Sequence, residues 1–352
     1  MPPASEHQPG DRSNDGGPFL TVRVLVTGAG GFIGHHLVTY LKERGYWVRG
    51  VDLKYPEYTE VDADEFEILD LRRWDNCLQA VRGVDQIYAL AADMGGMGFI
   101  SSNHATILRN NALINLHTMD AARIEGVERY LYSSSACIYP DYLQQNADVK
   151  PLREEDAYPA NPQDAYGWEK LVSERLAEYY HAEFGMETRI VRFHNIFGPY
   201  GTYDGGREKA PAALCRKIAQ IPDGGEIEVW GDGEQTRSFC YVDDCVEGIH
   251  RLMQSDHRYP LNLGTDRMVS INELARIIMT VAEKPNVRIR HIDGPQGVRG
   301  RNSDNSRLRE VLGWEPGTSL EDGLVPTYRW IEERLTGRTS TVSVREVAAP
   351  VS

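Results

Sequence analysis

Long apolar runs and paired cysteines are scarce in this chain of 352 residues. No stretch reaches the roughly 18 apolar residues that a membrane-spanning helix needs, and the polar segment 1–17 lacks the apolar core of a signal peptide. The cysteines are odd in number, show no metal-type spacing and indicate reduced thiols; they are Cys77, Cys137, Cys215, Cys240 and Cys245. We therefore expect a cytoplasmic protein with no membrane partner and no metal.

Positive charge is also in short supply. Lysine and arginine number 38 against 52 aspartates and glutamates, which gives a net charge of −14. Nucleic-acid binding needs clustered cations at the phosphates, so we expect no nucleic-acid partner. An anionic ligand would need its own local group of basic residues.

A strand, a glycine-rich loop and a helix stand in immediate succession near the start. The β-branched run 21–27 leads into the glycine loop 28–34, and a helical pattern follows as far as Gly45. Glycines allow a tight turn and a close approach to a pyrophosphate on the helix N-terminus. A second strand, 46–52, ends in Asp52, where a carboxylate can accept the ribose hydroxyls of a dinucleotide.

Strands and helices continue to alternate beyond this unit. Further strands are expected over 66–71, 85–92, 128–133 and 187–193, and helices over 73–82, 103–124, 164–184 and 241–253. Such alternation predicts an α/β fold, a Rossmann-type doubly wound parallel sheet with a smaller C-terminal substrate lobe. Ligands of such sheets bind at the carboxyl ends of the strands.

The domain boundaries follow from changes in spacing and composition. We expect a disordered tail over 1–19, an NAD-binding domain over 20–200 and a mainly substrate-binding lobe over 201–335. Part of 240–265 is expected to return to the first domain, and 336–352 to form a second tail.

Groups capable of redox chemistry gather between residues 131 and 170. Tyr166 and Lys170 are four residues apart and so share one helix face. Together with Ser135 they could move a proton and a hydride at a carbinol carbon. Proton and hydride transfer do not need the thiol of Cys137, so its presence indicates a further chemical step.

The loop Asp93–Phe99 carries three glycines. Because glycine has no side chain, the three glycines suggest that the loop backbone lies close to a ligand. The alternative is a flexible surface loop.

Several of these features resemble the extended short-chain dehydrogenase/reductase family of nucleotide-sugar enzymes. They are the glycine run, Asp52, the Tyr166–Lys170 pair and Arg192–Pro199. The resemblance covers about residues 21–335. Five longer segments are similar to the GDP-mannose 3,5-epimerase branch of that family: 92–100, 135–140, 206–211, 231–239 and 297–304.

The resemblance implies an NAD-dependent isomerase acting on a GDP-sugar, in the first place GDP-mannose. Tyr166, its pKa lowered by Lys170 and NAD, would take the proton of the sugar 4-hydroxyl, which Ser135 would hold. The transient 4-ketone would acidify the hydrogens on C3 and C5. Cys137 and Lys209 would handle those protons on opposite faces of the ring, and the hydride would then return to C4.

The resemblance also implies two sets of binding residues and a homodimer formed through the helices at 103–124 and 164–184. The cofactor set is Gly28, Gly31, Phe32, Ile33, Gly34, Asp52, Asp70, Leu71, Ala91, Tyr166 and Lys170. The substrate set is Gly95, Ser135, Ala136, Cys137, Asn195, Glu208, Lys209, Ala210, Lys217, Gln235, Thr236, Arg237 and Arg301.

Other functions stay open at this point. A GDP-4-keto-6-deoxymannose epimerase-reductase also carries a cysteine after the serines, but it consumes NADPH. Asp52 disfavours the 2′-phosphate of NADPH, whereas Lys54 and Arg72 could accept it. An epimerase of another GDP-sugar and a non-catalytic NAD-sensing scaffold are further alternatives. A 4,6-dehydratase would need an Asp-Glu pair where Ala136 and Cys137 stand.

Overall fold

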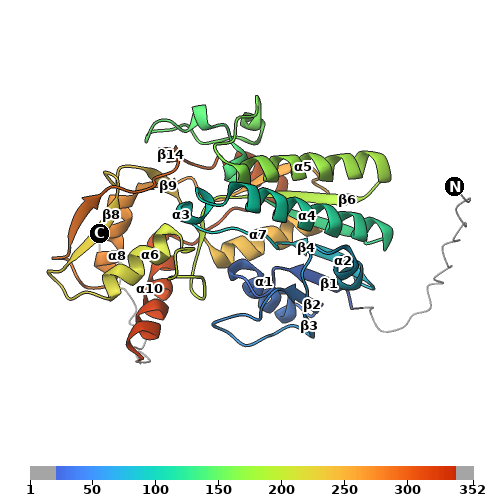
Figure 1. Cartoon of the computed structure of the whole chain (residues 1–352), viewed down its shortest axis with the longest axis horizontal. Helices are drawn as coiled ribbons and strands as arrows, with labels where there is room; N and C mark the ends of the chain where they lie inside the picture. Colours follow the sequence, from blue (N-terminus) through green and yellow to red (C-terminus); the bar gives the residue numbers. More distant parts are fainter. Residues whose placement is uncertain (1–20, 338–352) are drawn as a thin grey trace, which may run out of the picture.

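A seven-stranded parallel sheet forms the centre of the computed structural model, which describes residues 21–337 (Figure 1). Its strand order is β11-β6-β5-β4-β1-β2-β3. The strands are β1 (Arg23–Thr27), β2 (Trp47–Asp52), β3 (Glu65–Ile68), β4 (Gln86–Ala89), β5 (Arg129–Ser135), β6 (Glu187–Phe193) and β11 (Pro260–Leu263). All neighbouring pairs in it run parallel, which confirms the predicted fold class.

Helices cover both faces of this sheet. They are α1 (Phe32–Glu43), α2 (Trp74–Val81), α4 (His104–Ile124), α5 (Ala165–Phe184) and α7 (Val242–Gln254). Helices α1 and α7 pack together, as do α2 with α4 and α4 with α5. Within β1, Val24 and Val26 join the core cluster on the α1–α7 side, whereas Leu25 joins the cluster beneath α2 and α4. Strands buried on both faces explain the continuous apolar runs of the sequence.

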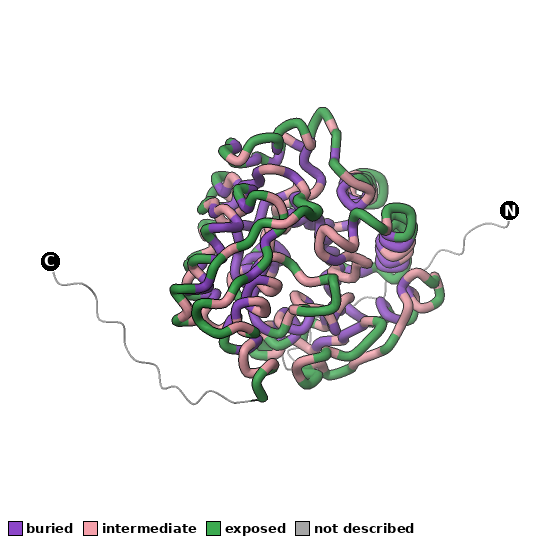
Figure 2. Tube along the Cα trace, turned by 60° about the vertical axis from the view of Figure 1, so that its left-hand side comes forward, coloured by how far each residue is buried: buried purple, intermediate pink, exposed green. Residues whose placement is uncertain are grey.

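Smaller elements gather beside the carboxyl ends of the strands (Figure 1). The helices are α3 (Met97–Ile100), α6 (Ala210–Ala219), α8 (Ile271–Val281), α9 (Ser306–Leu312) and α10 (Leu320–Thr336). The strands are β7 (Ile196–Phe197), β8 (Glu226–Trp230), β9 (Thr236–Ser238), β10 (Cys240–Tyr241), β12 (Met268–Ser270), β13 (Arg288–Ile292) and β14 (Gly300–Arg301). Short 3₁₀ turns occupy Ala136–Ile138, Asp141–Leu143 and Glu154–Ala157. Buried residues lie mainly in the interior of the molecule, and exposed residues lie mainly at its periphery (Figure 2).

Two predicted strands extend too far. The third was expected to reach Leu71, but β3 ends at Ile68 because the Asp70 carboxylate accepts hydrogen bonds from the Arg72 backbone and guanidinium instead. The fourth was expected to reach Ala92, but β4 ends at Ala89, since the next amides donate to the Thr27 hydroxyl.

The division into domains stays a prediction. Strand β11, within the segment expected to return, pairs with β6 in the main sheet. The tails predicted over 1–19 and 336–352 lie outside the described residues, except that Thr336 and Gly337 end α10. None of the helices within residues 21–337 combines the length and apolar character needed to cross a membrane.

Candidate active site

A cavity of about 1000 Å³ opens at the carboxyl ends of the central strands. Every residue of the predicted cofactor set lines it, and so does every residue of the predicted substrate set except Thr236. The fold thus brings together segments from the glycine loop at one end of the chain to Arg301 at the other.

The glycine loop is shaped by close backbone contacts. Gly28 has φ +73°, and a Cβ there would stand 2.9 Å from the Ala91 nitrogen. A Cβ on Gly34 would stand 2.0 Å from the Gly28 oxygen. Helix α1 then begins after Gly31 without any side chain capping its first amides. Uncapped amides and the positive helix end fit the pyrophosphate of a dinucleotide.

Asp52 lies at the next carboxyl end, as predicted. Its carboxylate accepts hydrogen bonds from Gly30 N at 2.9 Å and from Leu53 N at 2.6 Å. Burial raises the pKa of Asp52, and these backbone hydrogen bonds oppose that rise. The bonds hold the carboxylate in place beside the glycine loop, where it could accept ribose hydroxyls.

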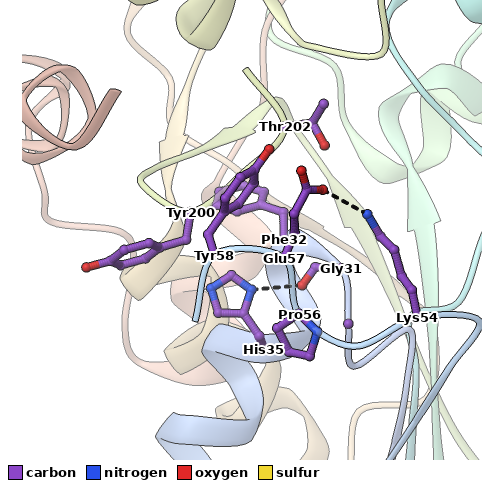
Figure 3. A pocket seen from close by; sticks show the side chains of 10 residues that line it. Gly31, Phe32, His35, Lys54, Pro56, Glu57, Tyr58, Tyr200 and Thr202 are labelled. Carbon is purple, nitrogen blue, oxygen red and sulfur yellow. Dashed lines mark hydrogen bonds and ion pairs between the residues drawn. The ribbon is translucent and has the colours of Figure 1, made fainter. Parts of the chain in front are cut away.

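The two cations that could favour a 2′-phosphate are both engaged by carboxylates. Lys54 Nζ lies 3.1 Å from Glu57 Oε2, in a small side pocket that also contains His35 and Tyr58 (Figure 3). Arg72 forms a double contact with Asp70, Nε and Nη2 each at 2.8 Å. Neutralised cations attract an extra phosphate weakly, which favours NAD over NADP.

Ser135, Tyr166 and Lys170 line the cavity together. Helix α5 begins where the Asp164 side chain accepts a hydrogen bond from Gly167 N at 2.8 Å, so Tyr166 and Lys170 lie in its first two turns. Both side chains are buried. Lys170 Nζ donates to the Ser133 carbonyl at 2.7 Å, which ties the helix to the end of β5.

The predicted lowering of the Tyr166 pKa involves bound NAD as well as Lys170, and it stays a prediction. Burial raises the pKa of Tyr166 well above its usual value, and a hydrogen bond with Ser135 only partly opposes this. Burial likewise lowers the pKa of Lys170. Desolvation of the charged forms therefore outweighs the attraction between phenolate and ammonium that the sequence suggested.

Cys137 lies in the 3₁₀ turn that follows β5, half-buried at the cavity wall. Its backbone amide donates to the Ser135 hydroxyl at 3.2 Å. Arg301 Nη1 lies 3.2 Å from the Cys137 sulfur. The Arg301 guanidinium thus donates a hydrogen bond to the sulfur, whose thiolate form is the one that acts as a base.

Lys209 precedes the first turn of α6 and lines the same cavity as Cys137. Desolvation lowers the pKa of Lys209, while the Cys137 side chain acts in the opposite direction. A lysine with a lowered pKa can both accept and return a proton. The structure thus joins in one cavity the two side chains that the sequence assigned to proton transfer.

The glycine-rich loop lies against protein. Gly96 N donates to the Arg207 carbonyl at 3.1 Å, and a Cβ on Gly96 would stand 2.5 Å from the Glu208 carbonyl oxygen. Arg207 in turn contacts Asp93 at 3.3 Å and covers the Phe99 ring. Gly95 and Gly96 both line the cavity, and Gly96 also seats the segment that carries Lys209.

Two guanidinium groups that line the cavity have no carboxylate partner among residues 21–337. Arg237 donates to the carbonyls of Val298 and Thr236, each at 2.7 Å, and Arg301 donates to Gln144 and Cys137. Burial, with Arg301 as a further cause, lowers the pKa of Arg237 to about 9. Neighbouring cations without a protein counter-charge fit an anionic ligand such as a diphosphate.

Other predicted substrate residues are held by backbone contacts. Lys217 Nζ donates to the Glu228 carbonyl at 2.7 Å, and Asn195 Nδ2 to the Ser238 carbonyl at 2.9 Å. Gln235 is buried, and its Oε1 has no hydrogen-bond partner in the described part of the chain. A buried acceptor without a partner is costly unless a ligand supplies the donor.

Thr236 is the one predicted site residue that the structure places elsewhere. Its hydroxyl donates to the Ala147 carbonyl, away from the cavity that Gln235 and Arg237 line. Successive side chains of an extended segment point to opposite sides, so Thr236 cannot share the orientation of its neighbours.

Sequence reasoning missed a buried polar cluster behind the site. Glu174 accepts from Arg192 Nε at 2.9 Å and Nη2 at 2.7 Å, and the Ser134 hydroxyl also donates to it. Arg192 is a charged residue that stands between the apolar residues Val191 and Phe193 of β6, and that position could have signalled the cluster. Gln144, which contacts Arg301 at 2.6 Å, had no motif to reveal it.

Comparisons with known proteins agree with this geometry. Residues 24–264 match the model of the NAD dependent epimerase/dehydratase family. The chain belongs to that family. The predicted cofactor, NAD, is thereby confirmed.

The relatives carry the resemblance further. GDP-mannose 3,5-epimerase 1 of Oryza sativa subsp. japonica is 53% identical over 90% of this chain and 84% of its own length. UDP-glucuronic acid decarboxylase 6 of Arabidopsis thaliana is 33% identical over 86% of this chain and 87% of its own. The predicted resemblance to the first group is confirmed.

Solved structures support the fold. UDP-glucose 4-epimerase of Thermotoga maritima aligns with a TM-score of 0.80 at 26% identity, covering 89% of this chain and all of that one. MoeE5, solved with UDP-glucose and NAD, gives 0.75 at 29% identity, with the same coverage.

Proposed function

We propose that this protein is an NAD-dependent GDP-mannose 3,5-epimerase. The observation that carries the proposal is the meeting of Cys137 and Lys209 with Ser135, Tyr166 and Lys170 in one cavity. A dehydrogenase needs only the last three residues, so the first two imply a second kind of chemistry. The identity of 53% to a rice GDP-mannose 3,5-epimerase supports the same activity.

Tyr166, Ser135 and Lys170 serve the redox step. Tyr166, as the phenolate that Lys170 and bound oxidised NAD would favour, takes the proton from the sugar 4-hydroxyl, and Ser135 holds the same oxygen. Lys170 braces the helix against Ser133 and places a positive charge near the phenol. Bound NAD supplies the reversible removal of hydride from C4.

Cys137 and Lys209 serve the inversion steps. A ketone at C4 makes the hydrogens on C3 and C5 acidic, and inversion needs one group to remove a proton and another to return it from the opposite face. The Cys137 thiolate, whose sulfur would accept a hydrogen bond from Arg301, is a competent base. Lys209, with its lowered pKa, is a competent proton donor at neutral pH.

The GDP portion accounts for the remaining polar groups of the cavity. Arg237 and Arg301 offer charge to a diphosphate. The unpartnered Gln235 Oε1 accepts a hydrogen bond from a ligand donor, which guanine and ribose both provide. Lys217, Asn195, Glu208 and other members of the predicted substrate set complete the pocket wall.

The proposed homodimer would form through the outer face of helices α4 and α5. Large apolar side chains are exposed there, namely Leu108, Leu116, Ile124, Trp168, Val172, Tyr179 and Phe184. Exposed apolar side chains on two neighbouring helices support a two-fold pairing of these helices into a four-helix bundle. A cytoplasmic location is supported by the five free thiols.

Incubation of the purified protein with GDP-mannose, without any reductant, tests the proposal. Conversion to GDP-hexose isomers inverted at C3, C5 or both is the expected result. A requirement for added NADPH would indicate the epimerase-reductase instead. Absence of any product, with NAD bound, would overturn the proposed activity.

A further inference from the structure

Gln144 connects two parts of the active site that are distant in sequence. Its side chain is buried and fully hydrogen-bonded. Nε2 donates to the carbonyls of Tyr139 at 3.0 Å and Pro140 at 3.2 Å, just beyond the cysteine turn. Oε1 accepts from Arg301 Nε at 2.6 Å. The amide therefore has one orientation, with its oxygen toward Arg301.

The backbone of Gln144 also links the segment after Cys137 to the segment that carries Arg301. Its carbonyl accepts from Arg299 N at 2.9 Å and from Gly300 N at 3.2 Å, so the segment before β14 is tied to the segment after Cys137. The position of Gln144 is thus determined from both sides, and its side chain cannot turn without breaking three hydrogen bonds.

Arg301 is aimed by this contact. A guanidinium is a rigid planar fork, so fixing Nε also fixes the direction of the two terminal nitrogens. One of them, Nη1, lies 3.2 Å from the Cys137 sulfur. Arg301 has no carboxylate partner within residues 21–337, so its full charge faces the thiol.

We propose that Gln144 is a positioning residue that aims Arg301 at the Cys137 sulfur and so sets the reactivity of that sulfur. The proposal deepens the proposed function, since it concerns how the proposed base is kept reactive. Its test nevertheless needs no sugar substrate, because thiolate reactivity can be measured directly.

Other charged or titratable groups also face Cys137. Tyr166 and Lys170 interact with it electrostatically from α5, Lys209 from the start of α6 and Arg237 from β9. None of these residues contacts the Gln144 side chain through a hydrogen bond within the described part of the chain. A change at Gln144 should therefore act on the thiol through Arg301.

The experiment is the rate of Cys137 alkylation by iodoacetamide across pH in the full-length protein with NAD. Mass spectrometry of the Cys137 peptide isolates this thiol from the four buried ones. Gln144→Leu should slow alkylation near neutral pH about tenfold and move the profile to higher pH. Gln145→Leu is the matched control, because exposed Gln145 contacts only Asp141 and should leave the profile unchanged.

A double variant separates positioning from support of the fold. Arg301→Leu should slow alkylation on its own, and adding Gln144→Leu should slow it no further. If the two substitutions together slow alkylation by the product of their separate effects, the proposal is overturned. It is also overturned if Gln144→Leu folds and its alkylation profile equals that of the wild type. If Gln144→Leu does not fold, Gln144→Glu decides: a carboxylate beside Arg301 should slow alkylation, and an unchanged rate would refute the proposal.

The two proposals can fail separately. The expected alkylation profiles together with no conversion of GDP-mannose would leave the role of Gln144 intact and remove the proposed activity. Conversion of GDP-mannose together with unchanged alkylation in the Gln144 variants would leave the proposed activity intact and remove the role of Gln144.

Discussion

Gly96 lies so close to Glu208 that a Cβ on the glycine would stand 2.5 Å from the Glu208 carbonyl oxygen. The contact joins a loop at the end of β4 to the segment just before α6. Because Lys209 follows Glu208 directly, the glycine controls the position of a proposed proton handler.

Gly96→Ala should therefore displace Lys209 and lower the epimerisation rate about a hundredfold, since shifts near 1 Å in a catalytic group have effects of this size. NAD binding should persist. Gly98→Ala in the same loop is the control, because its nearest neighbour is 4.0 Å away in Trp230, and it should retain most activity. Equal losses in the two variants would argue against the contact.

Cofactor preference provides a second prediction. Glu57 occupies Lys54 at 3.1 Å, and this ion pair holds the pKa of Glu57 below its usual value. Glu57→Gln should free the ammonium and improve binding of NADP relative to NAD by about threefold, a modest effect because the pair is exposed. Titration of both cofactors measures the ratio. Glu60→Gln, an exposed neighbour in the loop, should not change it.

Acid stability should depend on His194. Its ring is fully buried, and burial lowers its pKa to about 3 from 6.5. The unfolded chain therefore takes up a proton below about pH 6.5 that the folded chain refuses until about pH 3. The free energy of unfolding should fall as pH drops through that window, by up to about 1.4 kcal/mol per pH unit for this residue.

Urea unfolding of wild type and His194→Gln at a series of pH values measures that dependence. The variant should show a shallower slope. It should not become flat, because His35 is also buried with its pKa lowered to about 4. Identical slopes would show that His194 is not responsible.

The outer face of α4 and α5 leads to a prediction about assembly. Val172 is 64% exposed on α5, and Val172→Glu should place a charge at the centre of the proposed dimer contact. Sedimentation should then report monomers. Leu53→Glu is the matched control, since Leu53 is 61% exposed but lies after β2, and it should remain dimeric. A wild-type monomer would contradict the proposed pairing.

Much of the fold and of the cofactor site was predictable because the relevant signals are local. Strand, glycine loop and helix follow one another without interruption, and Asp52 ends the next strand. The rule that ligands bind at the carboxyl ends of parallel strands then placed these segments around one cavity. Tyr166 and Lys170 needed only the helical period to share a face.

Features that depend on three-dimensional packing were not predictable. In the short strand β9, alternate side chains face the cavity, and Thr236 is one that points away from it. No pattern in the sequence reveals which side chains of so short a strand face the cavity. Burial, rather than the neighbouring ammonium, sets the direction of the Tyr166 pKa. The contact between Gly96 and Glu208 joins residues more than a hundred positions apart in the chain, so the sequence did not reveal it.

Hydrogen exchange with solvent tests the central claim most directly. Incubation with GDP-mannose in deuterium oxide should introduce deuterium at C3 and C5 of the sugar, since both positions are deprotonated beside a transient C4 ketone. Cys137→Ala should keep bound NAD but lose this exchange at both positions. Undiminished exchange in Cys137→Ala would remove the thiol from the mechanism and contradict the account.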